Sequence, residues 1–304
     1  MKLTDDNQIY ICSFYSDKFQ YRFAAHRLRN QITKLPFVIK SFLYSEIQLF
    51  NIIENKYTNL LENFKSEKSK PGFAWFAWKP IVILNTLNKV PDGSVLLYLD
   101  IGCNLNASDN FWNNLISRNK SNGIVTAYSK GVGINQFGSK EITWTKNEVF
   151  EKLMISTVDK NSPQYQATWI MMINNENCRL LIQEWIELCT VDNFSLIKSV
   201  DKNALQSSNF VRHSHDQSIF SCLLKKNKIV PAVASKDDMS IISASRNLSV
   251  FSFHESNFFY KTLKLGERFL IKFLNMLFYK NPNENLVSED LKNTKTHTII
   301  RFLK

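Results

Sequence analysis

The stretch Leu96–Leu105, which reads LLYLDIGCNL, decides the fold class of this 304-residue chain. It follows Pro91-Asp92-Gly93, where proline presets φ, aspartate can bond its own backbone and glycine tolerates a positive φ. A strand is therefore predicted to begin near Ser94. The near-continuous apolar run Val95–Leu99 is typical of a strand covered on both faces, as in the parallel or mixed sheet of an α/β protein.

Asp100 comes directly after this strand. Ligands in open α/β sheets bind beyond the carboxyl ends of the strands, so Asp100 is a candidate ligand-binding carboxylate. The alternative is that Asp100 only caps the turn that follows.

Composition narrows the class of protein. A chain of 304 residues with 44% hydrophobic and 13% aromatic residues can bury a large core, which excludes a predominantly disordered protein. The formal net charge of +11 predicts an anionic partner, which could be a phosphate-bearing substrate, an acidic membrane surface or a nucleic acid.

The five cysteines indicate a reducing compartment, because their number is odd and they form no C-x-x-C pair. We predict a packing role for Cys103, close to Asp100. Charged residues occupy the amino terminus where a signal peptide needs its apolar segment. No uninterrupted apolar run of about 18 residues is present, so we expect a cytoplasmic protein without a transmembrane helix.

A strand followed by a basic helix is predicted at the start of the chain. Ile9–Phe14 alternates apolar and polar residues, and Phe23–Ile32 is predicted to be helical. Arg22 directly precedes this helical segment, which contains Arg27 and Arg29. The start of such a helix can bind phosphate. The alternative is that these arginines lie on a solvated helix face.

Strands and helices are predicted to alternate up to about residue 235, which favours one α/β domain. Further helices are expected over Ile47–Phe64, Val149–Ile155 and Asn177–Cys189, and further strands over Gly123–Tyr128 and Trp169–Ile173. Thr145–Glu148 fits a capping box ahead of one of these helices.

Two segments concentrate residues with chemical potential. The aromatic segment GFAWFAWKP (72–80) contains Lys79, which could meet a phosphate or extend to water. The segment RHSHDQS (212–218) places two histidines beside a carboxylate and an amide. Ser214 to Gln217 fits a capping box, but this leaves His213, His215 and Asp216 unexplained. His-x-His can bind a metal, although no third ligand is near in sequence.

Four motifs in register resemble those of bacterial and viral GT-A-fold glycosyltransferases encoded with capsule and lipopolysaccharide genes. They are GFAWFAWKP (72–80), LYLDIGC (97–103), WTK (144–146) and HSHDQSIF (213–220), and the resemblance covers residues 9 to about 235. It implies a Rossmann-like α/β fold with a mixed central sheet flanked by helices. It also implies a nucleotide-diphospho-sugar donor, with UDP as the expected nucleotide.

The resemblance also implies roles for individual residues. Asp216 and Gln217 are similar to the first two residues of the Asp-Gln-Asp motif of retaining enzymes, in which Ser218 here replaces the third. This similarity implies that Asp216 holds hydroxyls of the donor sugar and that Gln217 lies near the anomeric carbon. The implied nucleotide- and donor-binding residues are Ser13, Arg22, Arg27, Lys79, Asp100, Gly102 and His215.

The resemblance raises a question about a metal cofactor. Asp100 matches the first residue of the Asp-x-Asp motif that holds Mn²⁺ or Mg²⁺ in the broader class, but Gly102 replaces the second aspartate. Asp100 and His254 are the implied metal ligands if a divalent cation binds. Otherwise, Lys79, Arg22 or Arg27 could stabilise the leaving diphosphate.

The carboxyl-terminal tail forms a separate part. We predict a GT-A-like domain over residues 1–257 and a basic amphipathic helical tail over 258–304, where nine Lys/Arg and four Asp/Glu give a net charge of +5. On a helix, Arg268 and Lys272 share one face, whereas Phe269 and Phe273 lie on the other. Residues 258–280 could bind an anionic membrane surface, or the helix could pack on the catalytic domain.

These observations favour a glycosyltransferase of cell-surface polysaccharide synthesis, of the retaining type. A glycan or lipid-linked acceptor is expected, with the protein cytoplasmic or peripheral on the inner face of the membrane. One alternative is a basic nucleic-acid-binding protein, but the sequence has no recognition motif and its charge gathers in the tail, so we expect no nucleic acid. Another alternative is a degenerate transferase that binds nucleotide sugar without turnover.

Overall fold

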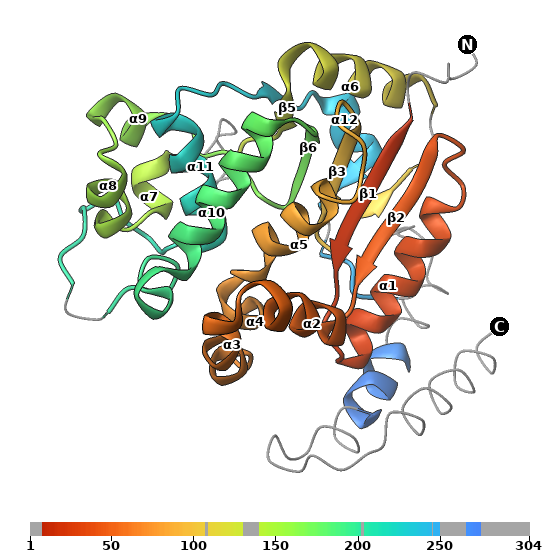
Figure 1. Ribbon diagram of the computed structural model, residues 1–304, viewed down its shortest axis with the longest axis horizontal. Helices are drawn as coiled ribbons and strands as arrows, with labels where there is room; N and C mark the ends of the chain where they lie inside the picture. Colours follow the sequence, from red (N-terminus) through yellow and green to blue (C-terminus); the bar gives the residue numbers. More distant parts are fainter. Residues whose placement is uncertain are drawn as a thin grey trace. The chain divides into compact units, whose positions relative to one another are not determined.

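The computed structural model describes residues 8–106, 109–129, 140–201, 204–244, 246–249 and 266–274 (Figure 1). The chain divides into two compact units, Met1–His254 and Glu255–Lys304. The first unit contains the sheet and its helices, and the described part of the second is a helix over residues 266–274.

A six-stranded mixed sheet forms the centre of the first unit, in the order β2-β1-β3-β6-β5-β7 (Figure 1). The strands are β1 (Ile9–Phe14), β2 (Val38–Tyr44), β3 (Val95–Leu99), β5 (Ile124–Thr126), β6 (Trp169–Ile173) and β7 (Ala232–Val233). β1 pairs in parallel with β2 and β3, and β5 with β7, whereas β6 is antiparallel to β3 and β5. The predicted α/β class with a mixed central sheet flanked by helices is therefore confirmed.

β3 lies at the centre of this sheet and is buried along its whole length, as its apolar run predicts. Leu96 and Tyr98 point into one hydrophobic cluster, whereas Leu97 and Leu99 point into a second cluster on the opposite face. This alternation follows from the two-residue repeat of a strand. Asp100 comes next along the chain, at the carboxyl end of the most enclosed strand.

Helices cover both faces of the sheet. One face is packed by α1 (Phe19–Ile32), α6 (Asp109–Asn122) and α12 (Lys236–Ile241), beside a two-stranded sheet of β4 (Asn104–Leu105) and β8 (Ile242–Ser243). The other face carries α2 (Glu46–Lys56), η2 (Thr58–Leu60), α3 (Leu61–Glu67), α4 (Gly72–Trp75), α5 (Trp78–Leu87), α7 (Glu141–Trp144), α8 (Asn147–Leu153), α10 (Glu176–Phe194) and α11 (Asp216–Lys226). The short α9 (Thr157–Asn161) buries no residue.

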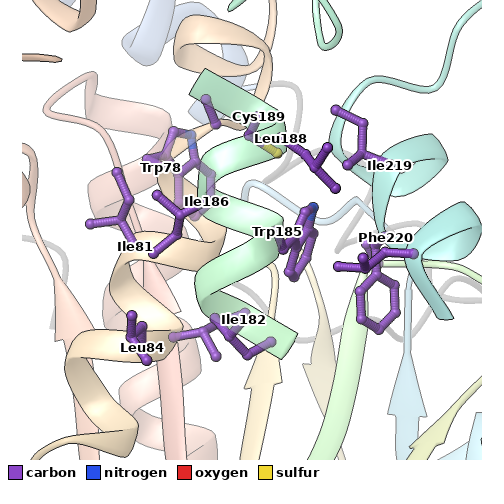
Figure 2. Close-up of a cluster of buried hydrophobic side chains, with 14 of the residues drawn as sticks. Trp78, Ile81, Leu84, Ile182, Trp185, Ile186, Leu188, Cys189, Ile219 and Phe220 are labelled. Carbon is purple, nitrogen blue, oxygen red and sulfur yellow. The ribbon is translucent and has the colours of Figure 1, made fainter. Parts of the chain in front are cut away.

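Helix α10 packs between α5 and α11, as Figure 2 shows. Trp185 of α10 packs against Phe220 of α11 with ring centroids 4.7 Å apart. Ile182 and Ile186 of the same helix lie toward Ile81 and Leu84 of α5 (Figure 2). Burial of these large side chains fixes the distance between α5 and α11, and these two helices supply the charged residues described below.

Some local predictions are wrong. The continuous helix over 47–64 is broken at Tyr57, which ends α2 with φ −140°. Neither predicted capping box forms: α8 begins after Lys146 and α11 after His215, and no side chain caps either helix. Thr145 instead donates its hydroxyl to Glu141.

In the second unit, residues 266–274 are helical, in agreement with that part of the tail prediction, while the rest of 258–304 lies outside the described residues. Phe269 is 66% and Phe273 is 52% exposed. The cations Arg268 and Lys272 are exposed as well, so aromatic and basic side chains share the exposed part of this helix. Across all described residues, no helix is both long and apolar enough to cross a membrane.

Candidate functional site

The centre of the candidate site is Lys79, near the start of α5 and buried with its side chain 3% exposed. Its Nζ atom lies 2.6 Å from Oδ2 of Asp216 and 3.2 Å from Oδ1 of Asp100, and it donates a hydrogen bond to the carbonyl of Ala167 at 3.0 Å. The fold therefore gathers three of the sequence-predicted residues into one charged group, which we call the Lys79 cluster (Lys79, Asp100 and Asp216).

The segment ahead of Lys79 is a left-handed turn, because φ is positive from Gly72 to Phe76. For residues other than glycine this conformation costs roughly 1–2 kcal/mol each. The turn is held by packing of Phe73 on Phe14, with ring centroids 5.6 Å apart, and by the Trp78 indole donating to the Gly72 carbonyl at 2.9 Å. It places the Phe76 ring centroid 5.2 Å from the Lys79 ammonium, where a cation–π contact adds to the ion pairs.

Asp100 is the exposed carboxylate of the cluster, with 30% of its side chain accessible. Its backbone N–H donates to Thr168 at 2.8 Å, and the Tyr98 hydroxyl donates to its Oδ1 at 2.6 Å. The turn is closed by the Cys103 N–H on the Asp100 carbonyl rather than by the side chain. The carboxylate is therefore held by Tyr98 and Lys79 and does not serve as the turn's cap.

Burial and the ion pairs shift the pKa values of this group in opposite directions. Burial raises the pKa of Asp216 to about 6, although the neighbouring Lys79 favours the charged carboxylate. Burial also opposes the charge on Lys79, but Asp100 and Asp216 together outweigh it and raise the pKa of this ammonium above its ordinary value. Burial raises the pKa of the Cys103 thiol, so this side chain is a poor nucleophile and the predicted packing role agrees with the structure.

The two histidines before Asp216 anchor its loop to the end of α10. The His213 Nε2 atom donates to the Leu196 carbonyl at 2.9 Å, and the His215 Nδ1 atom donates to the Ile197 carbonyl at 2.8 Å. Lys146 donates from its Nζ to the carbonyls of Ser195 and Lys198 at 2.7 and 3.2 Å. Three side chains thus donate to four consecutive carbonyls, those of residues 195–198 in the turn that follows α10, and tie the loop before Asp216 to this turn.

This anchoring argues against a metal at His213. Its Nδ1 accepts the Lys146 N–H at 3.5 Å, so both ring nitrogens are engaged and the ring is the neutral Nε2–H tautomer. Burial lowers the pKa of His213 well below its ordinary value, and also lowers the pKa of His215. His215 has φ 52°, a conformation rare for a residue with a side chain, at the point where the loop turns into α11.

Gln217 follows Asp216 on α11 and contacts the same backbone segment as Lys79. Its Oε1 accepts the Ala167 N–H at 3.2 Å, while the Ala167 carbonyl accepts from Lys79. Its Nε2 donates to Ser129 Oγ at 3.2 Å and to Gln164 Oε1 at 2.7 Å. Asp216 is therefore in direct contact with Lys79, and Gln217 is connected to Lys79 through the backbone of Ala167.

Arg27 holds the turn after Asp100. Its guanidinium, 2% exposed, donates to the carbonyls of Ile101 at 2.9 Å, Cys103 at 2.8 Å and Ser249 at 2.9 Å, and also to that of Asn247. These bonds join two segments of backbone, so Arg27 acts on the site by fixing the turn. Arg27 could contact a phosphate directly only by breaking its hydrogen bonds to these carbonyls.

Gly102 lies in the same turn and contacts residues 246–247 closely. A Cβ atom at this position would lie 3.1 Å from Cα of Arg246, and its carbonyl accepts the Asn247 N–H at 2.8 Å. An aspartate could therefore not be accommodated here without a shift of the backbone. The packing of this segment gives a physical reason for glycine at the second position of the Asp-x-Asp pattern.

The remaining predicted residues have other surroundings or lie outside the described residues. Arg22 pairs with Asp17 at 3.2 Å. Ser13 is buried in β1 and alternates with Cys12 and Phe14, which face the cluster's side of the sheet, so Ser13 points to the other face. His254 lies outside the described residues.

A divalent metal does not fit the residues seen here. Within the described ranges, no three His, Cys, Asp or Glu side chains are grouped so that they could hold an ion. The ammonium of Lys79 already lies between Asp100 and Asp216, and Gly102 supplies no second carboxylate. The chain itself thus supplies a cation, the Lys79 ammonium, between these two carboxylates.

Several residues around the cluster were not predicted from sequence. Tyr98 could have been found, since it lies two residues before Asp100 and a strand directs both to the same face. Gln164, Ala167 and Thr168 gave no signal, because their contribution depends on the path of the backbone before β6.

Comparison with known proteins gives similarity in structure alone. The sequence matches no family model and no curated protein. Mouse xyloside xylosyltransferase 1 in its apo form is similar with a TM-score of 0.39 and 11% identity, over 75% of this chain and 85% of that one. The apo WbbM bifunctional glycosyltransferase gives 0.38 and 8%, over 77% and 40%. The galactosyltransferase LgtC, in complex with donor and acceptor sugar analogues, gives 0.37 and 13%, over 94% and 99%.

Proposed function

We propose that this protein is a glycosyltransferase that transfers a sugar from a nucleotide-diphosphate donor, a UDP-sugar, to a glycan or lipid-linked acceptor in cell-surface polysaccharide synthesis. The observation that carries this proposal is the Lys79 cluster at the carboxyl end of β3. It joins an exposed carboxylate, a buried cation and a buried carboxylate where α/β sheets bind ligands.

The chemistry of sugar transfer needs such a group. The bond from the anomeric carbon to the diphosphate breaks through an oxocarbenium-like state, and negative charge grows on the departing diphosphate. Asp100, the accessible carboxylate, is assigned to the nucleotide side. Asp216 and Gln217 are assigned to the sugar, with Asp216 holding hydroxyls and Gln217 near the anomeric carbon, which favours retention of configuration.

We infer that Lys79 supplies the positive charge that a divalent ion supplies in related chemistry. Its ammonium is 2.6 and 3.2 Å from the two carboxylates, and the turn at Gly102 is packed against backbone. Cationic side chains are an established means of stabilising a leaving phosphate. Transfer is accordingly expected to proceed without added Mn²⁺ or Mg²⁺.

We also infer peripheral attachment to an anionic membrane surface through residues 258–280. The sequence from 258 to 304 has a net charge of +5, and the described helix exposes two phenylalanines beside two cations. Such a combination favours the interface of an anionic bilayer. A location on the inner face would place the enzyme near a lipid-linked acceptor.

The proposal is tested by thermal-shift measurements with UDP, GDP, CMP and dTDP, each with and without Mn²⁺, on wild type and Asp100→Ala. A ligand at about 100 times its Kd adds roughly 2.7 kcal/mol to the free energy of unfolding. Stabilisation of wild type by UDP, and none of Asp100→Ala, supports the assignment. If none of the four stabilises the wild type, the proposal is wrong.

A second candidate, a transferase that binds nucleotide sugar without turnover, is favoured by Gly102 in place of an aspartate. Stabilisation by UDP without release of UDP from UDP-glucose, UDP-galactose, UDP-xylose or UDP-N-acetylglucosamine, in the presence of acceptor extracts, would support it. A nucleic-acid-binding protein would instead show salt-sensitive DNA binding that Asp100→Ala leaves unchanged.

A further inference from the structure

Helix α11 carries a polar stripe on one face, and the proposed sugar transfer uses only the first residue of this stripe. Gln217, Ser218, Ser221 and Lys225 recur at the spacing of one helix face. Ser218 and Ser221 are completely buried, as are Glu141 of α7 and Gln164 opposite them. Buried polar groups are costly unless each is hydrogen-bonded, so a stripe of this length needs an explanation.

Glu141 is the acceptor at the centre of this network. Its Oε1 accepts from the Thr145 hydroxyl at 2.6 Å and from Gln164 Nε2 at 2.8 Å. Its Oε2 accepts from the Ser221 hydroxyl and from the Lys225 ammonium, each at 2.5 Å. The buried negative charge of Glu141 therefore fixes the direction of the hydrogen bonds from these four groups.

Gln164 connects Glu141 to Gln217 in the candidate site. Because its Nε2 must donate to the Glu141 carboxylate, its Oε1 is turned toward α11 and accepts from Gln217 Nε2 at 2.7 Å. The Gln217 amide is then fixed in turn, and its Oε1 faces the Ala167 N–H at 3.2 Å. If the amide of Gln164 or Gln217 were rotated by 180°, its NH2 group would face another donor and its oxygen another acceptor.

We propose that Glu141 and Gln164 are positioning residues that set the orientation of the Gln217 amide beside Lys79 and Asp216. This inference rests on the proposed function, in which Gln217 lies next to the anomeric carbon. The Glu141 charge holds the Gln164 amide, the Gln164 amide holds that of Gln217, and Ala167 connects Gln217 to Lys79. A displacement of about 1 Å in such a group can reduce a rate by about 100-fold.

The competing explanation is that the network only joins α7 to α11. A matched control separates the two explanations. Asn174 has an amide that is also completely buried, and its Nδ2 donates to the carbonyls of Leu87, Val90 and Pro91 at 3.0, 2.8 and 3.1 Å. These bonds lie at the turn before β3, at the end of the strand opposite Asp100.

Four variants test the proposal: Gln164→Met, Glu141→Gln, the double exchange Glu141→Gln/Gln164→Glu, and the control Asn174→Leu. The first readout is the side-chain amide resonance pair of Gln217, identified by its loss in Gln217→Ala. The second is kcat and KM for release of UDP from UDP-glucose, UDP-galactose, UDP-xylose and UDP-N-acetylglucosamine, with the melting temperature as the measure of stability.

We expect Gln164→Met and Glu141→Gln to shift the Gln217 amide resonances and to reduce kcat by about 10- to 100-fold, with KM changed by less than about threefold. The double exchange places an amide donor at 141 opposite a carboxylate at 164, which can still accept from Gln217 Nε2, so it recovers kcat relative to Glu141→Gln. Asn174→Leu lowers the melting temperature but leaves kcat and the Gln217 resonances unchanged.

Unchanged Gln217 resonances in Gln164→Met overturn the proposal, and so does a fall in kcat in Asn174→Leu equal to that in Gln164→Met. If the wild type releases UDP from none of the four donors, the proposed function fails with these donors. The amide resonances then still determine whether Glu141 and Gln164 orient Gln217, so the two failures are distinguishable.

Discussion

The Lys79 ammonium lies 2.6 Å from the Asp216 carboxylate, and both side chains are at least nineteen-twentieths buried, with exposures of 3% and 5%. These residues come from α5 and α11, which are held apart by α10. Asp100 joins them at 3.2 Å from the end of β3. One cation therefore lies between two carboxylates, of which only Asp100 is substantially accessible.

Replacing Lys79 with methionine should abolish donor turnover and destabilise the fold. The substitution leaves Asp216 and Asp100 beside each other with no counter-charge, and breaking a buried ion pair in this way costs about 3–5 kcal/mol. Urea unfolding measures the change in the free energy of unfolding, and UDP release measures turnover.

The control for this variant is Lys65→Met, which removes an exposed pair with Glu62 whose side chains are 52% and 81% accessible. Exposed pairs contribute at most about 1 kcal/mol, so this variant should unfold like the wild type. Equal stability of Lys79→Met and Lys65→Met would contradict the ion-pair geometry.

Donor turnover should rise with pH as Asp216 ionises, with an apparent pKa of about 6. The protonated form of Asp216 pairs poorly with Lys79, so kcat/KM falls below this pH. A group whose folded pKa lies above its ordinary value of 3.8 stabilises the protein below that value and loses this contribution as pH rises through 6. Asp216→Asn should remove the rise in activity and the accompanying fall in stability; a wild-type profile flat from pH 5 to about 8 would contradict this assignment.

The contribution of His213 to stability should change with pH in the opposite direction to that of Asp216. Burial holds the folded pKa of His213 well below 6.5, so the stability it contributes is present above pH 6.5 and is lost as pH falls. Protonation would also break the bond from the Lys146 N–H to Nδ1. Melting temperatures measured against pH should therefore decrease on acidification more steeply for the wild type than for His213→Gln. Parallel curves for the two proteins would exclude this role.

The sequence analysis singled out individual residues of the candidate site, but it did not predict how they are arranged in space. Asp100 was found because an apolar strand and a turn surround it, and Asp216 and Gln217 because polar residues precede an apolar helix. For Lys79 the sequence left two alternatives open, a side chain that extends to water or one that contacts a phosphate. The structure buries it between two carboxylates, a result of packing α5 and α11 on α10 that no local pattern contains.

Local patterns failed where a side chain had a more distant partner. Thr145 was predicted to cap a helix, but its hydroxyl donates to the buried Glu141 instead. For Arg27 the sequence left open a phosphate contact or a solvated helix face, whereas the structure buries Arg27 and its guanidinium donates to backbone carbonyls more than 70 positions along the chain. Strand β2 escaped prediction, since it is an edge strand with exposed Ile39 and Lys40 that weaken its apolar pattern.

Membrane binding should depend on the exposed aromatic residues of the second unit. We expect wild-type protein to sediment with phosphatidylserine-containing vesicles and not with phosphatidylcholine vesicles, and binding to weaken with salt. Phe269→Ser/Phe273→Ser should lose binding, because these side chains are 66% and 52% exposed. The control is Leu205→Ser, a change at a 92% exposed residue of the first unit. Equal loss in the control, or wild-type binding to neutral vesicles alone, would contradict the prediction.

Restoring the Asp-x-Asp pattern by Gly102→Asp should not create a metal-dependent enzyme. The new Cβ would lie 3.1 Å from the Arg246 backbone, and overpacking of this kind costs about 1–3 kcal/mol. The displaced turn carries Asp100, so UDP release should fall whether or not Mn²⁺ is present, and Gly102→Ala should show part of the same loss. Wild-type turnover should be unchanged by EDTA, since Lys79 supplies the cation between Asp100 and Asp216. Loss of wild-type activity in EDTA with recovery in Mn²⁺, or a gain of Mn²⁺-dependent activity in Gly102→Asp, would show that a metal rather than Lys79 stabilises the leaving diphosphate.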